Sequence, residues 1–246
     1  MRSNWSVYGQ YGRGQNIPPT SVFDVKNAAV GQPPKPILTD TVQFGSVWKG
    51  RRATLDVDGY HINFQADYSS TLDPVTGDTN YFLNGKLVTQ GVEAESTLLT
   101  GGGFAIYLNA TKGSAKYTDS KLWSQNAPSD TETLGLTYNN AHWSVGYFNK
   151  RIGQMFNDNG STHQAIVIDP FTIANLFVNY SLGTHSSLSP TRIRIGVNNL
   201  TNTHAITGVT AASTASSLPA PGDILTKMAG RSVSVSLTVG VTRANP

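Results

Sequence analysis

The sequence contains no cysteine, few charged residues and no long apolar run, and each absence excludes a class of protein. Without cysteine there is no disulfide, no thiolate nucleophile and no zinc–thiolate site. No apolar run approaches the roughly 18 residues that a membrane helix requires. The first residues are not followed by the apolar core of ~7–15 residues that defines a secretory signal. We therefore expect either a chain that is not exported or one whose true N-terminus lies upstream.

Charged residues make up 13% of the 246 residues, about half of the roughly 25% that is typical of soluble chains. Serine, threonine, asparagine and glycine take their place, which suits a chain whose outer surface is partly shielded from water. The formal net charge is only +3, and no run of like charges occurs. Composition therefore does not indicate a nucleic-acid partner, and we expect none.

The stretch 231–241 shows most clearly the pattern that is present. Its apolar residues share one parity, and serine, threonine and glycine occupy the other. Successive side chains of a strand point to opposite faces, so this strand has one apolar and one small, polar face. A soluble sheet would place the apolar face on a protein core, whereas a transmembrane barrel would place it in lipid. The apolar residues are Val233, Val235, Leu237, Val239 and Val241.

Similar stretches recur about ten times, and no amphipathic helix is evident. The connections between them are alternately long and short, so one rim of the sheet has tight turns and the other has long loops. Bacterial outer-membrane barrels have this asymmetry. We predict an all-β fold, an antiparallel transmembrane β-barrel. The predicted strands span 4–12, 39–49, 51–65, 81–99, 104–111, 132–138, 143–150, 168–182, 191–200 and 231–241.

Three local signals sharpen this prediction. In the predicted strand 51–65, the apolar residues occupy odd positions before Gly59 and even positions after it. Such a switch at a glycine indicates a β-bulge or a change of environment. The glycines at 101–103 predict a tight turn between two strands. Asn139 and Asn140 predict a hairpin turn, because asparagine tolerates positive φ.

Five motifs, in chain order, resemble the C-terminal barrel strands of TonB-dependent outer-membrane receptors. The third, which is similar to the family pattern N-x-G followed by G-V-E-x-E, is the most specific. The chain departs from the family pattern at Gln15, where an aromatic residue is usual, and at Ala229, where proline is usual. The motifs are VYGQYGRG at 7–14, FGSVWK at 44–49, NGK at 84–86 with QGVEAE at 90–95, VNNLTN at 197–202, and GR at 230–231.

The resemblance implies that residues 1–246 form part of the receptor's β-barrel domain. It implies about ten C-terminal strands of a barrel of about 22 strands, with the plug domain and the N-terminal strands absent. The family usually ends on an aromatic residue that the barrel-assembly machinery reads. The matching position here is Val241, with residues 242–246 beyond it. The final strand is then expected to be an open edge, because its closing partner is missing.

The resemblance also implies a function. Such receptors import a scarce nutrient, such as a ferric siderophore, cobalamin or a carbohydrate, across the outer membrane of Gram-negative bacteria. The partners it implies are the TonB–ExbB–ExbD complex, acting through the missing plug, the barrel-assembly machinery, the lipid bilayer and a small-molecule substrate. Two alternatives stay open: a smaller passive porin-like barrel, and a soluble β-sheet module that binds carbohydrate.

The sequence contains few candidates for binding residues, and all of them lie on the presumed lumen face. Glu93 and Glu95 are two residues apart on one strand, so both project to the same side. They could form an acid–base pair or a cation site, but the interpretation we favour is a pair of lumen-facing polar residues in a water-filled barrel, which basic residues of the next strand could balance. The same reasoning covers Asp56 and Asp58.

Arg192 and Arg194 also face the presumed lumen, where they could attract an anionic ferric chelate or simply balance lumen acids. The five histidines are scattered singly without metal-ligand spacing. No nucleophile elbow or nucleotide-binding glycine loop occurs. We therefore expect no catalytic residue, no resident metal and no cofactor, and we expect the protein not to be an enzyme.

Overall fold

The computed structural model describes residues 4–17, 36–72, 79–158, 165–182, 191–210 and 223–240. These residues form strands and turns, in agreement with the all-β prediction. Within the same ranges, no helix is long and apolar enough to cross a membrane.

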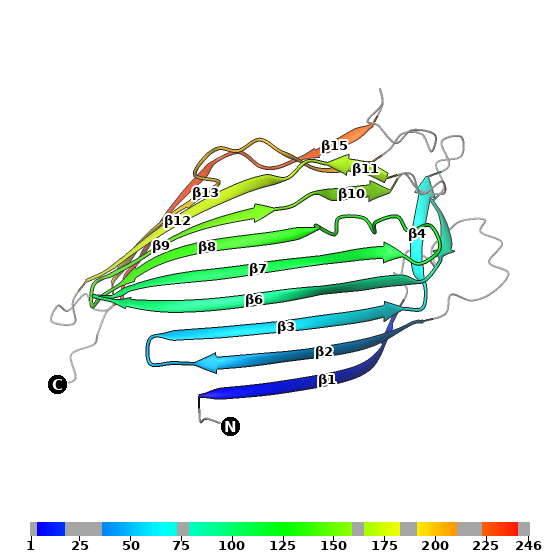
Figure 1. Ribbon diagram of the computed structural model, residues 1–246. Helices are drawn as coiled ribbons and strands as arrows, with labels where there is room; N and C mark the ends of the chain where they lie inside the picture. The colour runs from blue at the N-terminus through cyan, green and yellow to red at the C-terminus, as the bar shows by residue number, and fades with distance from the viewer. Residues whose placement is uncertain are drawn as a thin grey trace, which may run out of the picture.

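Ten strands form one antiparallel sheet in which almost every neighbour follows in chain order (Figure 1). The predicted number of about ten strands is confirmed. From one edge to the other, the strands are β1 (Trp5–Asn16), β2 (Ile37–Lys49), β3 (Ala53–Phe64), β6 (Leu87–Gly101), β7 (Phe104–Tyr117), β8 (Asp130–Asn139), β9 (Trp143–Ile152), β12 (Phe171–Ser181), β13 (Arg192–Asn198) and β16 (Ser232–Thr238).

The sheet is open, because β1 and β16 are its two edges and each pairs with a single neighbour. The prediction that the closing strand is an edge is confirmed for Ser232–Thr238. Val241 lies outside the described residues. The ten described strands therefore do not form the small closed barrel that one alternative required.

The long connections contain short strands that the sequence pattern did not reveal. Three two-stranded ribbons lie beyond the same end of the sheet, on the right of Figure 1, and tight turns close the opposite end. The predicted sorting of long and short connections onto two rims is thus seen in the described part of the chain. The ribbons are β4 (Asp67–Leu72) with β5 (Thr79–Asn84), β10 (Met155–Asp158) with β11 (Ala165–Ile168), and β14 (Ile206–Thr210) with β15 (Ile224–Lys227).

Several predicted strand boundaries were wrong. The first strand continues to Asn16 and not only to residue 12, and the stretch predicted from residue 168 begins as β12 at Phe171. The stretch 81–99 contains two strands and not one, because regular strand structure is interrupted between β5 and β6 at Gly85. A Cβ at Gly85 would collide with the carboxylate of Asp119. The carbonyl of Lys86 accepts a hydrogen bond from the backbone N–H of Thr118 (2.8 Å) and so fixes this break. The predicted end of the next strand at residue 111 was too early, since β7 continues to Tyr117.

The register places apolar side chains in continuous rows across one face, hereafter the apolar face. One such row crosses seven neighbouring strands. Its members stay accessible: Leu136 is 45% exposed and Val233 is 64% exposed. No described element packs over them, so this face has no protein core. In order from β6 to β16, the row is Leu98, Ile106, Leu136, Tyr147, Leu176, Val197 and Val233.

The buried apolar side chains gather instead at the rim with the long connections. There β10 and β11 approach β14, and Ile166 is fully buried between them. This small cluster, with Met155, Ile166, Ile168 and Val209, joins two of the ribbons. The other buried apolar residues lie at the same end of β2, β6 and β7, apart from Ala174 of β12, and they are Ile37, Leu87, Ala115 and Tyr117.

The parity change at Gly59 is a change of environment and not a bulge. The residue pairs with Phe44 on one side and Val92 on the other, and the register runs through it unbroken. Beyond it the apolar face becomes polar. His61 contacts the side-chain oxygens of Gln90 (3.0 Å) and Asn63 (3.2 Å). The apolar band of β3 therefore ends at this glycine.

Both predicted hairpin turns are confirmed, but one forms for a different reason. Gly101, Gly102 and Gly103 have φ of 98°, 61° and 90°, which favours glycine. Asn140, by contrast, does not have positive φ. Its side-chain Oδ1 accepts hydrogen bonds from the backbone N–H of His142 (2.9 Å) and of Trp143 (2.7 Å). The side chain closes this turn as an Asx turn does.

Two of the motifs meet at Asn199, a residue 2% exposed with φ of 50°. Its Nδ2 donates to the carbonyls of Thr203 (2.9 Å) and Ala229 (3.0 Å). Its Oδ1 accepts from the N–H of Thr203 (2.8 Å). Asn202 accepts from the N–H of Arg231 (2.9 Å). These bonds fix where the chain enters β16, so the motif residues have a structural role.

Candidate functional site

The face opposite the apolar rows, hereafter the polar face, carries the candidate residues. Asp56 of β3 lies directly opposite Glu95 of β6, and Asp58 lies opposite Glu93. Because each pair is two residues apart on its own strand, all four carboxylates project to the same side. We call these four residues the acidic block. The sequence showed two separate pairs, and the register unites them.

Like charges directly opposite each other destabilise a sheet, so the acidic block needs compensating groups. Neutral donors from flanking strands supply hydrogen bonds. The ion pairs formed among the described residues, Arg13–Asp40 and Arg151–Asp130, both lie on the apolar face. Neither of these ion pairs includes a residue of the acidic block. The donors are Tyr8 to Asp56 (3.4 Å), Gln43 to Asp58 (2.9 Å), Tyr107 to Glu95 (3.0 Å) and Thr111 to Glu93 (3.1 Å).

The acidic block is not a preformed metal centre. Across the described ranges, no three His, Asp or Glu side chains converge in an arrangement that could hold a metal ion. Hydroxyl and amide donors occupy one oxygen of each carboxylate. The four carboxylates of the acidic block create a negative electrostatic potential on the polar face, and this potential attracts cationic groups near that face.

Arg192 and Arg194 lie on the polar face of β13 but far from the acidic block. Five strand-to-strand steps separate β6 from β13, roughly 24 Å at the usual spacing of about 4.8 Å. Arg194 donates through Nε to the Oδ1 of Asn179 on the neighbouring strand (2.7 Å). The structure thus places all the candidates on one face, with the acids and the arginines in separate patches.

Sequence reasoning missed a set of aromatic rings that lie flat against this face. Each ring comes from the residue directly opposite a glycine, and it occupies the space that a Cβ there would need. At Gly135 that Cβ would lie 2.6 Å from the Cε1 of Phe148. The sequence does contain glycines at alternate positions that fall on the polar face, but which aromatic residue faces each glycine depends on the register. The pairs are Tyr8 on Gly45, Tyr60 on Gly91, Phe148 on Gly135 and Phe177 on Gly146.

Three of the rings on this face form a continuous strip next to the acids. Phe148 and Phe177 are stacked with centroids 5.9 Å apart, and Tyr107 lies 6.3 Å from Phe148. The hydroxyl of Tyr107 donates to Glu95. Negative charge and aromatic faces therefore adjoin on the polar face, a combination that favours cationic or planar groups.

Comparison with known proteins gives the same architecture. The family model described as TonB dependent receptor-like, beta-barrel matches residues 2–200. No curated protein sequence matches the chain significantly. Among solved structures, the copper transporter OprC has a TM-score of 0.74 and 15% identity over 96% of this chain and 37% of its own.

Two further structures are similar. The ferric enterobactin receptor PfeA of Pseudomonas aeruginosa has a TM-score of 0.70 and 16% identity, over 97% of this chain and 38% of its own. The ferric-catecholate import receptor Fiu of E. coli K12 has a TM-score of 0.66 and 18% identity, over 96% and 33%. At these identities the likeness shows the fold alone. The chain spans about a third of the length of these structures.

Proposed function

Because the chain belongs to the TonB-dependent receptor-like β-barrel family, we propose that it forms ten strands of an outer-membrane receptor that imports a scarce nutrient. Members of this family are receptors and transporters, not enzymes, and they reside in the outer membrane of Gram-negative bacteria. We propose the same location for this chain. Residues 1–246 would then form part of the barrel domain.

The observation that carries this proposal is the uncovered apolar face. Burying one Val, Leu or Ile side chain is worth about 1.5–3 kcal/mol, and a single row spans seven strands with no protein layer over it. A bilayer supplies that cover. At the short-turn rim the same face carries aromatic pairs, among them Trp143 with Tyr180, whose centroids are 4.6 Å apart. Such pairs suit the interfacial girdle of a barrel.

The polar face would then line the lumen, and we propose that it contributes to substrate binding. The acidic block, with Glu93 and Glu95, would attract cationic groups of whatever fills the lumen. Arg192 and Arg194 would attract an anionic chelate. Solved relatives are named for copper, ferric enterobactin and ferric catecholates, which supports a metal–chelate class of substrate and leaves cobalamin and carbohydrate as the other classes to test.

We propose that energy for import comes from the TonB–ExbB–ExbD complex acting on a plug segment outside these 246 residues. The barrel-assembly machinery would insert the strands, and the chain by itself would leave β1 and β16 unpaired. Neither alternative is favoured by a specific observation. A soluble binding module would need to cover the apolar face, and the described strands do not close as a small porin does.

Uptake by cells that express the intact gene product tests the proposal. Under iron limitation, we expect accumulation of a radiolabelled ferric chelate that stops when a protonophore collapses the inner-membrane potential. Labelled cobalamin and maltodextrin serve as the other substrate classes. Accumulation that is indifferent to the protonophore for every substrate would indicate a passive pore. A protein that leaves the cell envelope in salt and buffer without detergent would indicate a soluble module.

A further inference from the structure

Three long connections lie beyond the same end of the sheet and meet at the short strand β10 (Figure 1). The first connection consists of residues 118–129, between β7 and β8. The second consists of the described residues 153–158 and 165–170, and it contains β10 and β11. The third consists of the described residues 203–210 and 223–228, and it contains β14 and β15.

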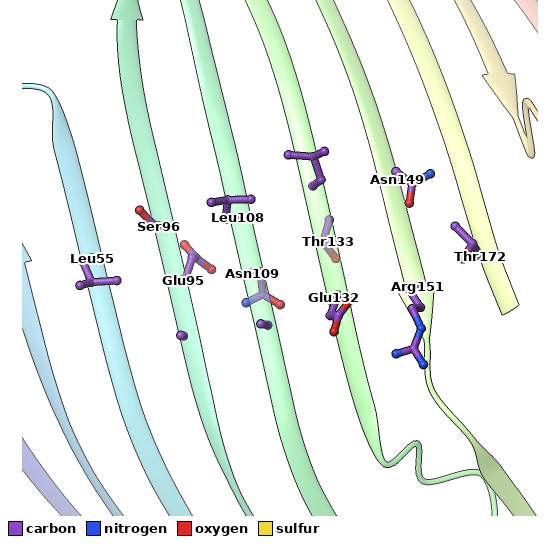
Figure 2. Close-up of a pocket in the computed structure, with 13 residues that line it drawn as sticks. Leu55, Glu95, Ser96, Leu108, Asn109, Glu132, Thr133, Asn149, Arg151 and Thr172 are labelled. Carbon is purple, nitrogen blue, oxygen red and sulfur yellow. The ribbon is translucent and has the colours of Figure 1, made fainter. Parts of the chain in front are cut away.

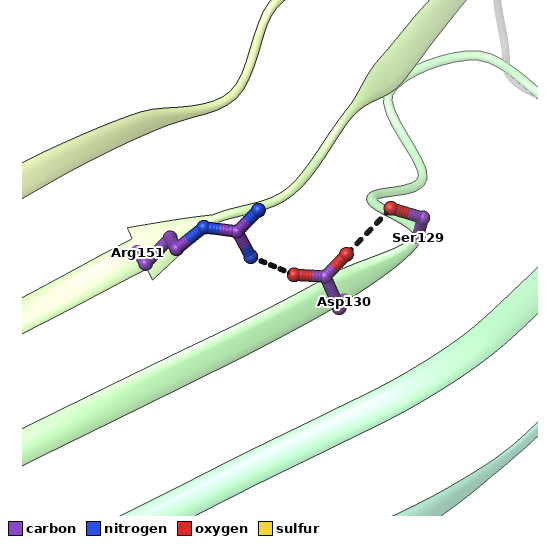
Figure 3. Close-up of polar contacts among 3 residues, drawn as sticks. All are labelled: Ser129, Asp130 and Arg151. Atoms are coloured by element: carbon purple, nitrogen blue, oxygen red, sulfur yellow. Dashed lines mark hydrogen bonds and ion pairs between the residues drawn. The ribbon is translucent and has the colours of Figure 1, made fainter.

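The first and second connections are joined at their bases around Asp130. Arg151 donates to one carboxylate oxygen of Asp130, and the Ser129 hydroxyl donates to the other (2.7 Å; Figure 3). The backbone N–H of Gly153 donates to the carbonyl of Asp130 (2.8 Å). The backbone N–H of Ser129 donates to the carbonyl of Gln154 (2.9 Å). The end of the first connection and the start of the second are therefore bonded to each other.

No second layer supports these bases on the apolar face. An open cavity of about 600 Å³ lies there. Figure 2 shows Arg151 and Asn149 toward one side of it and Leu55 toward the other. Because no described element fills this space, the hydrogen bonds around Asp130, and not packing against another layer, hold the two bases together.

Farther from the sheet, the first connection contacts Phe156 of β10. The backbone N–H of Asn126 donates to the carbonyl of Phe156 (2.9 Å). The ring of Trp123 stacks on the ring of Phe156, with centroids 5.4 Å apart and an angle of 23° between the planes. The first connection is itself fixed to β7, since the N–H of Ser124 donates to the carbonyl of Ala115 (2.8 Å). The first connection thus ties β10 to the sheet.

The next residue of β10, Asn157, contacts the third connection. Side chains of consecutive strand residues point to opposite faces, so Phe156 and Asn157 face different neighbours. Asn157 is 8% exposed, and its Nδ2 donates to the carbonyl of Val209 on β14. Ile166 of β11 and Val209 are buried where the two strands approach each other. Two consecutive residues of β10 therefore bind the first and the third connection.

The side chain of Asn157 contributes orientation more than stability. Its Oδ1 is buried and has no hydrogen-bond partner in the part of the chain that the structure describes. An apolar residue of similar size would leave no buried polar atom unpaired there. A hydrogen bond has a preferred geometry, whereas apolar contacts allow sliding. Asn157 therefore favours one arrangement of β14 against β10.

We infer that the three connections behave as one unit with β10 at its centre, and that Asn157 couples the third connection to the first. A molecule that orders one of the outer connections then orders the other, and the reverse holds equally. This inference goes beyond the proposed function. It does not depend on lipid contact or on transport, because every contact that carries it lies among the long connections and the strand ends that hold them.

Hydrogen exchange of the purified intact receptor in detergent tests the coupling without any substitution. Two backbone amides report on the outer connections: that of Asn126, and that of Met228, which donates to the carbonyl of Ala205 (2.9 Å). At alkaline pH, where local opening limits exchange, we expect both amides to exchange in one step at one rate. Amides of β8 should exchange more slowly. Different rates for the two reporters would overturn the inference, and so would a common rate equal to that of β8, because the whole sheet would then be opening.

Substitutions on the two sides of β10 test the direction of the effect at neutral pH. Asn157→Asp keeps the shape of the side chain but replaces the donor with an oxygen that faces a carbonyl. It should speed exchange at Asn126 and Met228 about fivefold, the effect of one lost hydrogen bond. Trp123→Leu, on the other side of β10, should also speed exchange at both reporters.

Asn16→Asp is the matched control, because it makes the same change at an exposed position of β1 and should leave both reporters unchanged. Acceleration of Met228 alone by Asn157→Asp, or of Asn126 alone by Trp123→Leu, would overturn the inference. Equal acceleration by Asn16→Asp would do the same. Uptake is not a readout of these experiments, so their failure leaves the proposed function standing, and a failed uptake assay leaves the coupling standing.

Discussion

Asp58 of β3 lies directly opposite Glu93 of β6, so two like charges face each other across a pair of neighbouring strands on the polar face. Asp56 and Glu95 face each other in the same way, two residues further along each strand. Hydrogen bonds from neutral side chains support these acids, and no described cation forms an ion pair with them. The sheet tolerates this repulsion, which marks the acidic block as the part of the polar face suited to bind cationic groups.

Removing one charge of a facing pair should relieve that repulsion. We expect Glu93→Gln to raise the free energy of unfolding by about 0.2–1 kcal/mol, measured by urea titration of the protein in detergent. Glu132→Gln provides the matched control, because Glu132 faces Arg151 and no acid; it should lower stability slightly or leave it unchanged. A clear loss of stability in Glu93→Gln would mean that a cation already balances the acidic block.

The turn at Asn199 should be essential for β16. Asn199→Ala removes three hydrogen bonds of a buried side chain and places alanine at positive φ. With a net loss of about 1 kcal/mol for each bond, we expect destabilisation by about 2–4 kcal/mol, seen as a lower urea midpoint. Asn109→Ala, at a polar-face position of β7, should change stability by less than about 0.5 kcal/mol. Equal effects at the two sites would contradict a role for the turn.

The glycines opposite the flat aromatic rings should not accept a methyl group. At Gly135 the new Cβ would lie 2.6 Å from the ring of Phe148, and overpacking of this kind costs about 1–3 kcal/mol. We expect Gly135→Ala to unfold at lower urea, and the added change Phe148→Leu to recover much of the loss. Gly12→Ala is the control, since nothing lies within 4 Å of its Cβ. A tolerated Gly135→Ala would show that the ring does not lie in this slot.

Because neighbouring side chains of a strand lie on opposite faces, substitutions of two neighbouring residues can test what each face contacts. Leu136 and Thr137 are neighbours on β8, the first on the apolar face and the second on the polar face. In a bilayer, Leu136→Arg should cost about 2–4 kcal/mol of folding free energy, and Thr137→Arg should cost little. The measurement is reversible unfolding of the protein in lipid vesicles. In a soluble sheet with an uncovered face, the two substitutions would have similar, small effects.

The sequence predicted the features that local pattern controls. Alternation at 233–239 indicated the two faces, the glycines at 101–103 indicated a turn, and the order of loop lengths indicated two different rims. The acidic block could not be predicted, because Asp58 and Glu93 meet only through a register set 35 residues apart. The ribbons in the long connections were missed because strands of four to six residues show too little periodicity.

A cavity on the apolar face, lined in part by Ala94 and Ala110, could not be predicted from the sequence either. Ala94 and Ala110 are ordinary members of two alternating strands, and only their direct pairing creates a trough. Asn140 shows the same limit on a smaller scale. The residue type indicated a turn, but whether the backbone or the side chain closes that turn depends on local geometry that composition does not determine.

The central claim is that the apolar face contacts lipid and the polar face contacts water. Since the chain has no cysteine, single cysteines can be introduced on β8 at 133, 134, 136, 137 and 138 and spin-labelled in protein reconstituted into vesicles. Gly135 is left out, because the ring of Phe148 occupies the space that a side chain there would need. Collision with oxygen, which concentrates in lipid, should peak at 134, 136 and 138, and collision with a soluble nickel chelate should peak at 133 and 137. Equal access of the chelate to all five positions would contradict the claim.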